Sequence, residues 1–238
     1  MRRRRALQII PIDGLPEVGP GDVLAELLAA CVRPEPDLLA GDVVVVTSKV
    51  VSKAEHRLVD LAAGGLSPAD VVEAESVRVL RRRGDLVISE TTHGFVCANA
   101  GVDLSNVADG WAAMLPHDPD RSARRIRDGL RARLGVEVAV IVSDTFGRPW
   151  RRGVTDVALG VAGIAPIVDL RGCTDSFGRP LVATEVAVAD ELAAAAELVM
   201  GKATGVAASV VRGVEPAWLR EGSVRDEVVR SPTEDLFR

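Results

Sequence analysis

The sequence predicts a mixed α/β fold, because short apolar runs with strand character alternate with segments of helical periodicity. Two runs are typical of buried strands: residues 43–46 are four valines, and residues 138–142 are almost uniformly apolar and β-branched. Hydroxyl and charged side chains follow both runs directly. Ligands of open α/β sheets bind at the carboxyl ends of strands, so these two strand ends are the first candidates for a functional site.

The other elements follow from apolar spacing and turn residues. Further strands are predicted at residues 9–12, 86–90 and 207–211. Helices are predicted at residues 23–31, 69–76, 122–134 and 185–200, and another is expected to begin at residues 54–58. Asp22 and Ser67 stand at expected N-caps, and Gly201 stops the helix at 185–200. Residues 64–85 are otherwise loop-like, the arginine-rich residues 122–134 suit a solvated face, and the small residues 153–164 suit close packing.

Composition and charge exclude several classes of protein. The chain has 238 residues, 47% of them hydrophobic, which suits one large domain or two small ones with a sizeable core. With a net charge of -5, four Phe, three Trp and no Tyr, it lacks the basic surface and stacking residues of a nucleic-acid binder. No signal-peptide segment follows the basic start, Arg2 to Arg5, and no apolar run is long enough to span a membrane.

The cysteine and histidine pattern argues against a zinc site. Cys31, Cys97 and Cys173 are widely spaced and suit neither a disulfide framework nor a zinc motif, which favours a reducing cytoplasm. The three histidines are scattered and form no H-x-x-x-H pair. A bound metal is therefore expected to have oxygen ligands and to be Mg²⁺ or Mn²⁺.

The stretch Ser143-Asp144-Thr145-Phe146-Gly147-Arg148-Pro149-Trp150-Arg151-Arg152-Gly153 follows the strand at 138–142. It offers one carboxylate, two hydroxyls, a turn at Gly147 and Pro149, and three arginines. In a metal–nucleotide site the acid holds the metal and the cations hold phosphate. The other interpretation is a strand end, a turn and a solvated basic loop, and this stretch alone leaves both open.

Lysine is rare in this chain. Of the 29 basic residues only Lys49, Lys53 and Lys202 are lysines, and lysine is a compact point charge that arginine cannot always replace at a phosphate. Lys49 and Lys53 follow the valine strand and its hydroxyls, which predicts a phosphate cradle that is not a Walker A loop, because the glycines are missing. Their charges would repel unless an anion lies between them. The other interpretation is that the three lysines have no common role.

Two further patterns carry weaker signals. Asn99, Asp103 and Asn106 place short polar side chains at a strand exit, where turn chemistry is an alternative to ligand binding. The hexapeptide at 144–149 recurs as Asp-Ser-Phe-Gly-Arg-Pro at 175–180. We expect two similar turns, which face one site unless the second is a turn without a ligand.

Taken together, these segments resemble the coenzyme F-420:L-glutamate ligases, the γ-glutamyl ligases of a deazaflavin coenzyme. The matching segments follow the family's order over about residues 8 to 215: Gly14–Pro16, Thr47–Glu55, Asn99–Asn106, Ser143–Arg148, Arg151–Gly153 and Met200–Lys202. None of them is decisive singly.

The resemblance implies an unusual γ-glutamyl ligase fold with mixed sheets in an intertwined, cytoplasmic homodimer. It implies GTP as a substrate, Mg²⁺ or Mn²⁺ as cofactor and K⁺ as a further ion. Such ligases add L-glutamate through its amine to the carboxylate end of the coenzyme precursor and then extend it by γ-linkage. The ligase domain would be residues 1–215, and residues 216–238 would be a tail or linker. Residues 231–238 resemble the junction to a flavin-binding domain in two-domain members.

The resemblance also assigns residues. Asp144, Arg148 and Lys53 would be catalytic, and Asp103, Asp144 and Thr145 would hold metal. The nucleotide would contact Leu15, Pro16, Glu17, Val18, Ser48, Lys49, Lys53, Asn106, Met200, Gly201, Lys202, Ala203, Thr204, Gly205, Val206 and Ala207. Some members carry a glutamate, a ligand of a second metal, where this chain has Lys202. The resemblance leaves that second site open: it is completed by other residues, or the lysine contacts phosphate directly.

The residue chemistry agrees with a ligase. A carboxylate reacts with an amine only after activation, and phosphoryl transfer, which depends on positioning and charge neutralisation, yields an acyl phosphate. No Ser-His-Asp or Cys-His arrangement stands out, so a hydrolase is not favoured. Two alternatives stay open: a metal-dependent phosphatase or phosphotransferase that uses the same aspartates, and a GTP-binding module without catalysis.

Overall fold

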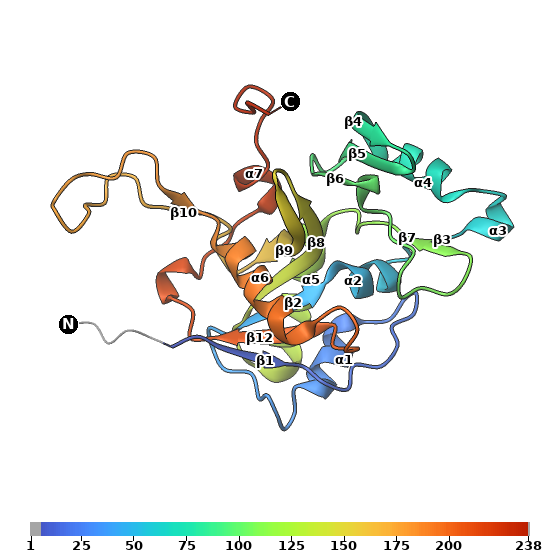
Figure 1. The fold of residues 1–238 in the computed structure, drawn as a ribbon. Coiled ribbons are helices and arrows are strands. Elements are labelled where there is room, and N and C mark those ends of the chain that lie inside the picture. Colours follow the sequence, from blue (N-terminus) through green and yellow to red (C-terminus); the bar gives the residue numbers. More distant parts are fainter. Residues whose placement is uncertain (1–5, 238) are drawn as a thin grey trace.

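The computed structural model describes residues 6–237, and the basic segment Arg2 to Arg5 lies outside them. A five-stranded sheet of order β1-β12-β2-β8-β9 forms the centre (Figure 1). Its strands are β1 (Gln8–Pro11), β12 (Ala208–Arg212), β2 (Val43–Thr47), β8 (Ala139–Arg148) and β9 (Arg151–Ala162). β2 and β8 pair in parallel, whereas the other neighbours pair antiparallel. This mixed sheet confirms the predicted mixed α/β class.

Helices cover both faces of the central sheet. α1 (Leu24–Cys31) and α5 (Pro119–Leu134) pack on one face, and α6 (Val188–Met200) packs on the other. Val44 and Val46 belong to the core under α1 and α5, while Val43 and Val45 belong to the core under α6. Successive side chains of a strand point to opposite faces, so a strand covered on both sides reads as an unbroken apolar run.

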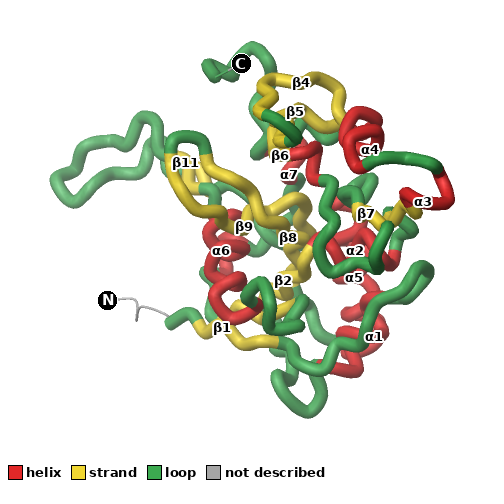
Figure 2. Tube along the Cα trace, turned by 45° about the vertical axis from the view of Figure 1, so that its right-hand side comes forward, coloured by secondary structure: helices red, strands yellow, loops and turns green. Residues whose placement is uncertain are grey.

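Smaller elements surround this body. Within the described residues, three small sheets are formed by β3 (Leu58–Asp60) with β7 (Trp111–Ala113), by β4 (Ser76–Arg83), β5 (Leu86–Thr91) and β6 (Val96–Ala98), and by β10 (Val168–Asp169) with β11 (Glu185–Val186). The other helices are α2 (Ser48–Ala54), α3 (Leu61–Gly64), α4 (Pro68–Glu75), α7 (Val224–Glu227) and the 3-10 helices η1 (Asn99–Gly101) and η2 (Pro216–Trp218). The segment between β10 and β11 extends from the body in Figures 1 and 2. No helix within residues 6–237 has the length and apolarity needed to cross a membrane.

The helix after the valine strand differs from its prediction. It begins at Ser48 instead of residue 54 and ends at Ala54, and the chain then enters β3. Val51 and Ala54, three residues apart, both pack into the core shared with α1 and α5. This packing outweighs the weak helix preference of the β-branched residues in the segment.

Two other predictions fail locally for reasons of pairing. Asp22 is not the N-cap of α1, because its carboxylate accepts a hydrogen bond from the Gly19 N–H at 2.7 Å and closes the preceding turn. Residues 76–83 form the strand β4 instead of a loop, because they pair with β5. The Ser67 N-cap of α4 is confirmed, and the Ser67 N–H donates a reciprocal hydrogen bond to the Asp70 carboxylate.

The strand at 138–142 also extends further than predicted. β8 continues to Arg148 and pairs with β9, so Asp144 and Thr145 lie within a strand and the chain turns at Pro149 and Trp150. The partners of residues 143–148 are residues 151–158, and a local pattern does not show that the two segments pair. The hairpin places Thr145 opposite Asp156.

Gly160 of β9 lies against the start of α5. A Cβ on this residue would overlap the backbone of Pro119 and Asp120, which cannot yield as a flexible side chain can. Asp120 is buried there and accepts hydrogen bonds from the Val161 N–H at 2.8 Å and, in the C-terminal segment, from the Val224 N–H at 3.1 Å. We therefore expect Gly160→Ala to lower the free energy of unfolding by about 1–3 kcal/mol in urea denaturation.

The matched control is Gly147→Ala in β8, where an added Cβ meets nothing within 4 Å. Its free energy of unfolding should stay within about 0.5 kcal/mol of the parent value. Equal urea midpoints for the two variants would contradict the close approach at Gly160.

Candidate active site

A cavity of about 990 Å³ lies where β2 and β8 end. The parallel register of these strands pairs Thr47 with Ser143, so the two predicted strand ends lie side by side. α2 follows β2 directly, and the loop after α6 completes the wall. Segments far apart in the sequence therefore meet: residues 47–53, 97–107, 143–147 and 197–207, together with Glu17, Val154 and Asp156.

Most of the predicted site residues line this cavity. They are Glu17, Ser48, Lys49, Lys53, Asp103, Asn106, Asp144, Thr145, Gly201, Lys202, Ala203, Gly205, Val206 and Ala207. The predicted residues that are not part of the lining are Leu15, Pro16, Val18, Arg148, Met200 and Thr204.

The residues outside the lining have structural partners. Val18 and Met200 are buried in the two cores. The Thr204 hydroxyl bonds the Met200 carbonyl and so shapes the loop after α6. Arg148 donates to the carbonyls of Arg152, at 2.7 Å, and Gly153, at 3.4 Å, which ties its guanidinium to the tip of the β8–β9 hairpin.

Lys49 and Lys53 lie one helical turn apart on α2 and both line the cavity. Lys49 Nζ donates to the Ser105 carbonyl at 2.8 Å and lies 2.5 Å from Asp103 Oδ2. Lys53 Nζ pairs with Glu17. Carboxylates of the protein, one for each lysine, thus offset both ammonium charges.

Asp103 and Asp144 differ in their proton affinity. Burial raises the pKa of Asp144 to about 6, and the charges of Asp156 and Asp103 add to this rise, although hydrogen bonds from Thr145 and Ser48 oppose it. Burial also raises the pKa of Asp103, but hydrogen bonds from Lys49 and Ser105 outweigh it and hold that pKa below its ordinary value. At pH 7 both carboxylates are therefore ionised, and their charges repel.

Sequence reasoning missed Asp156 and Glu197, which also line the cavity. Asp156 on β9 is buried, and its Oδ1 accepts from the Thr145 hydroxyl at 2.7 Å and from Lys202 Nζ at 2.8 Å. Glu197, on the last turn of α6, pairs with the same ammonium at 2.8 Å. A lone aspartate in the otherwise small and apolar run 153–164 was the one signal for Asp156.

The donor set around Asp144 fits a hard divalent cation. Carboxylate and hydroxyl oxygens of Asp103, Asp144 and Thr145 are ligands that Mg²⁺ and Mn²⁺ prefer. A cation there would stabilise the ionised form of Asp144, whose pKa is raised by burial and, to a smaller extent, by the charges of Asp156 and Asp103. Within residues 6–237 no group of three or more His, Cys, Asp or Glu side chains is arranged to hold a metal ion. The protein would thus supply two carboxylates, and the remaining ligands would come from elsewhere.

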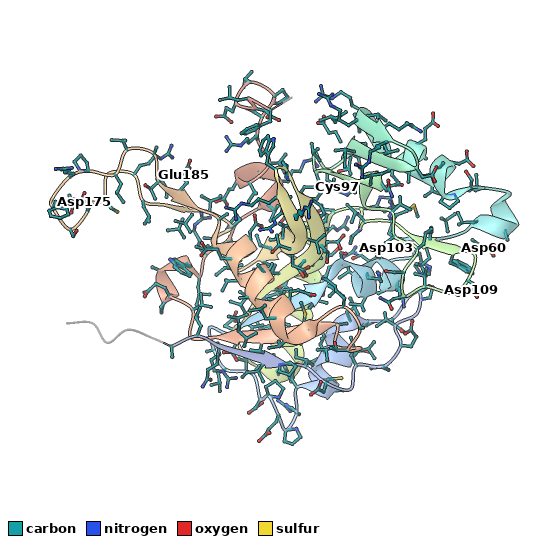
Figure 3. The ribbon with its side chains drawn as sticks, viewed as in Figure 1. Asp60, Cys97, Asp103, Asp109, Asp175 and Glu185 are labelled. Carbon is teal, nitrogen blue, oxygen red and sulfur yellow. The ribbon has the colours of Figure 1, made fainter. Side chains whose placement is uncertain are left out.

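The second copy of the hexapeptide does not share the site. Residues 175–180 form a turn in the segment between β10 and β11, where Asp175 accepts from the N–H groups of Phe177 and Arg179. Figure 3 shows Asp175 at the far end of this segment, on the opposite side of the molecule from Asp103. The first copy lies in β8, so the expectation of two similar turns facing one site is wrong.

Comparisons with known proteins agree with this geometry. The model of the F420-0:gamma-glutamyl ligase family matches residues 14–213. The coenzyme F420:L-glutamate ligase of Methanothermobacter thermautotrophicus is 45% identical, over 98% of this chain and 99% of its own. The corresponding ligases of Methanopyrus kandleri, 43% identical over 98% of both chains, and Methanocaldococcus jannaschii, 37% identical over 100% of this chain and 99% of its own, are similar over the same extent. This chain is therefore a ligase that belongs to the F420-0:gamma-glutamyl ligase family.

Proposed function

We propose that this ligase adds L-glutamate to the precursor of coenzyme F-420 and uses GTP to activate the precursor's carboxylate. Membership of the family supports the glutamate addition. The cavity at the ends of β2 and β8 supports the proposed binding of a nucleotide and a cation. It brings together two lysines of α2 and two aspartates, Asp103 and Asp144. Phosphoryl transfer needs such charge neutralisation and positioning.

The acidic and the basic residues of the cavity would have different roles. Asp103 and Asp144, with Thr145, would hold Mg²⁺ or Mn²⁺, which when bound neutralises charge on the transferred phosphoryl group. Lys49 and Lys53 would donate charge-assisted hydrogen bonds to the phosphates. The loop at 201–207 lines the same cavity and would close over the nucleotide.

The reaction balances in two steps. An oxygen of the precursor's carboxylate attacks the γ-phosphorus of GTP, which gives an acyl phosphate and GDP. The amine nitrogen of L-glutamate then attacks the acyl carbon, phosphate leaves, and the amine gives up a proton. The lysines lower the barrier of the first step by holding the triphosphate in place as charge moves toward GDP.

Mass spectrometry of the precursor tests this proposal. The precursor is incubated with the protein, GTP, Mn²⁺ and L-glutamate, and we expect its mass to increase by one glutamate residue per cycle. A phosphatase would instead release phosphate without requiring glutamate. A GTP-binding module would bind GTP and change neither substrate. Either of these results, with an unchanged precursor mass, would overturn the proposal.

The raised pKa of Asp144 predicts how cation binding depends on pH. Below about pH 6 the carboxyl is protonated, so a cation must displace that proton. The apparent Mn²⁺ affinity should fall by up to about tenfold per pH unit below pH 6 and level off above it. Calorimetric titrations from pH 5 to pH 8 measure this dependence, and a flat profile across that range would exclude Asp144 as a ligand.

The same shift predicts stability in the absence of cation. Between pH of about 4 and 6 the folded chain keeps a proton on Asp144 that the unfolded chain releases. Without cation, the free energy of unfolding should therefore decrease as pH rises through this window. Saturating Mn²⁺ should oppose this decrease.

We also propose that the chain forms a homodimer. Large apolar side chains are exposed on segments that extend from the body: Val77 and Val79 on β4, and Phe177 and Val182 between β10 and β11. Such side chains mark association surfaces when they cluster. Light scattering should give twice the chain mass of 25.1 kDa. A monomer mass throughout the micromolar range would contradict the dimer.

A further inference from the structure

The loop after α6 places Lys202 against side chains from three elements. Lys202 Nζ lies 2.8 Å from Asp156 Oδ1 on β9 and 2.8 Å from Glu197 Oε1 on α6, and it also bonds the Thr145 hydroxyl on β8. An ammonium has three N–H donors. The three oxygens therefore use all of them, and the ammonium is coordinated by oxygen as a bound cation would be.

The oxygens around Lys202 carry more negative charge than its ammonium offsets. The Asp156 side chain is 1% exposed and that of Glu197 is 17% exposed, so water screens neither carboxylate well. Among residues 6–237, Glu197 Oε2 is one of two buried side-chain oxygens or nitrogens without a hydrogen-bond partner. Two poorly solvated carboxylates that share one position need either a cation between them or a proton on one of them.

We propose that the Lys202 ammonium acts as a built-in cation in this carboxylate cluster and takes the place of a second metal ion. The chain then uses one divalent cation, at Asp103 and Asp144, and this part rests on the proposed function. Lys202 is a positioning residue: it ties the loop at 201–207 to the floor of the cavity through Thr145 and Asp156. A compact ammonium suits this role, whereas a planar guanidinium suits two-pronged contacts.

An ordinary salt bridge would also hold the loop, but the two roles predict different results when the charge is removed. If Lys202 only anchors the loop, a neutral side chain loosens the loop and no ion is gained. If it stands in for a metal ion, Asp156 and Glu197 keep their position and bind a cation from solution. Counting bound ions separates the two roles without any measurement of turnover.

The experiment counts Mn²⁺ bound to the full chain at pH 8 and low ionic strength, from the electron paramagnetic resonance of the free ion. The parent chain should bind one Mn²⁺, and Lys202→Met should bind two. Lys202→Arg keeps the charge and should bind one. The matched control is Lys53→Met, which also removes one positive charge from the cavity. The carboxylate that loses its partner is then Glu17, whose side chain is 83% exposed and screened by water. This variant should also bind one.

A double variant keeps the test decisive if Lys202→Met folds poorly without metal. Lys202→Met with Glu197→Gln removes one positive and one negative charge, so it should fold without metal and bind one Mn²⁺. Two ions on the parent chain, two on the double variant, or no gain in Lys202→Met would overturn the inference. No ion on the parent chain and one on Lys202→Met would support it and would contradict the proposed cation at Asp103 and Asp144.

Discussion

Replacing Asp144 with asparagine is expected to slow glutamate addition by roughly a thousandfold while leaving the fold intact. A metal ion that stabilises transition-state charge contributes several kcal/mol, and about 4 kcal/mol corresponds to a factor of roughly a thousand in rate. Asparagine has the shape of aspartate but lacks the charge that a divalent cation requires. Burial disfavours the ionised Asp144 carboxylate. At pH 8 the melting temperature of the variant should therefore equal or exceed that of the parent.

Two comparisons make this experiment specific. Asp128→Asn removes a carboxylate from the exposed face of α5, where it pairs with Arg127 at 3.0 Å, and it should turn over at the parent rate. Asp103→Asn should lose activity as Asp144→Asn does. Parent turnover in either cavity variant would rule out the shared cation, and a lower melting temperature would assign the loss to unfolding. Rates come from the precursor's mass, and melting temperatures come from calorimetry.

Replacing Lys53 with methionine is expected to weaken GTP binding about ten- to a hundredfold. Its side chain is 10% exposed at the cavity wall, and its partner Glu17 is well solvated, so a phosphate can take over the ammonium readily. A hydrogen bond to a charged group contributes about 1.5–3 kcal/mol, which corresponds to that loss of affinity. Lys53→Arg should also bind GTP less tightly, because a planar guanidinium does not fit a site that holds a compact ammonium.

Lys49→Met should weaken GTP binding by a similar factor, and it should also release Asp103 from its ion pair. The matched control is Arg131→Met, which removes a cation from the exposed face of α5 and should leave GTP binding unchanged. Calorimetric titration with GTP measures the affinity of all four variants. Unchanged affinity in both Lys49→Met and Lys53→Met would place the nucleotide elsewhere.

Much of the central sheet could be predicted from local pattern. The runs at 43–46 and 138–142 are apolar on both faces, and such runs are stable only where helices cover both sides of a sheet. The polar residues after them are candidates for a functional site, and the parallel register of β2 and β8 places them at one sheet edge. The helix after β2 starts earlier than its local pattern predicts because the packing of Val51 and Ala54 decides its start.

By itself the sequence determined the chemistry available at the site: two aspartates and two lysines at strand ends, with few other candidates for a phosphate. Only the tertiary structure decided which charge meets which. Asp156 reaches Thr145 through the β8–β9 hairpin, and Glu197 reaches Lys202 through the last turn of α6. Ion pairs form over a few ångströms between elements far apart in the chain. Their partners therefore depend on how the elements pack, which periodicity and residue type do not encode.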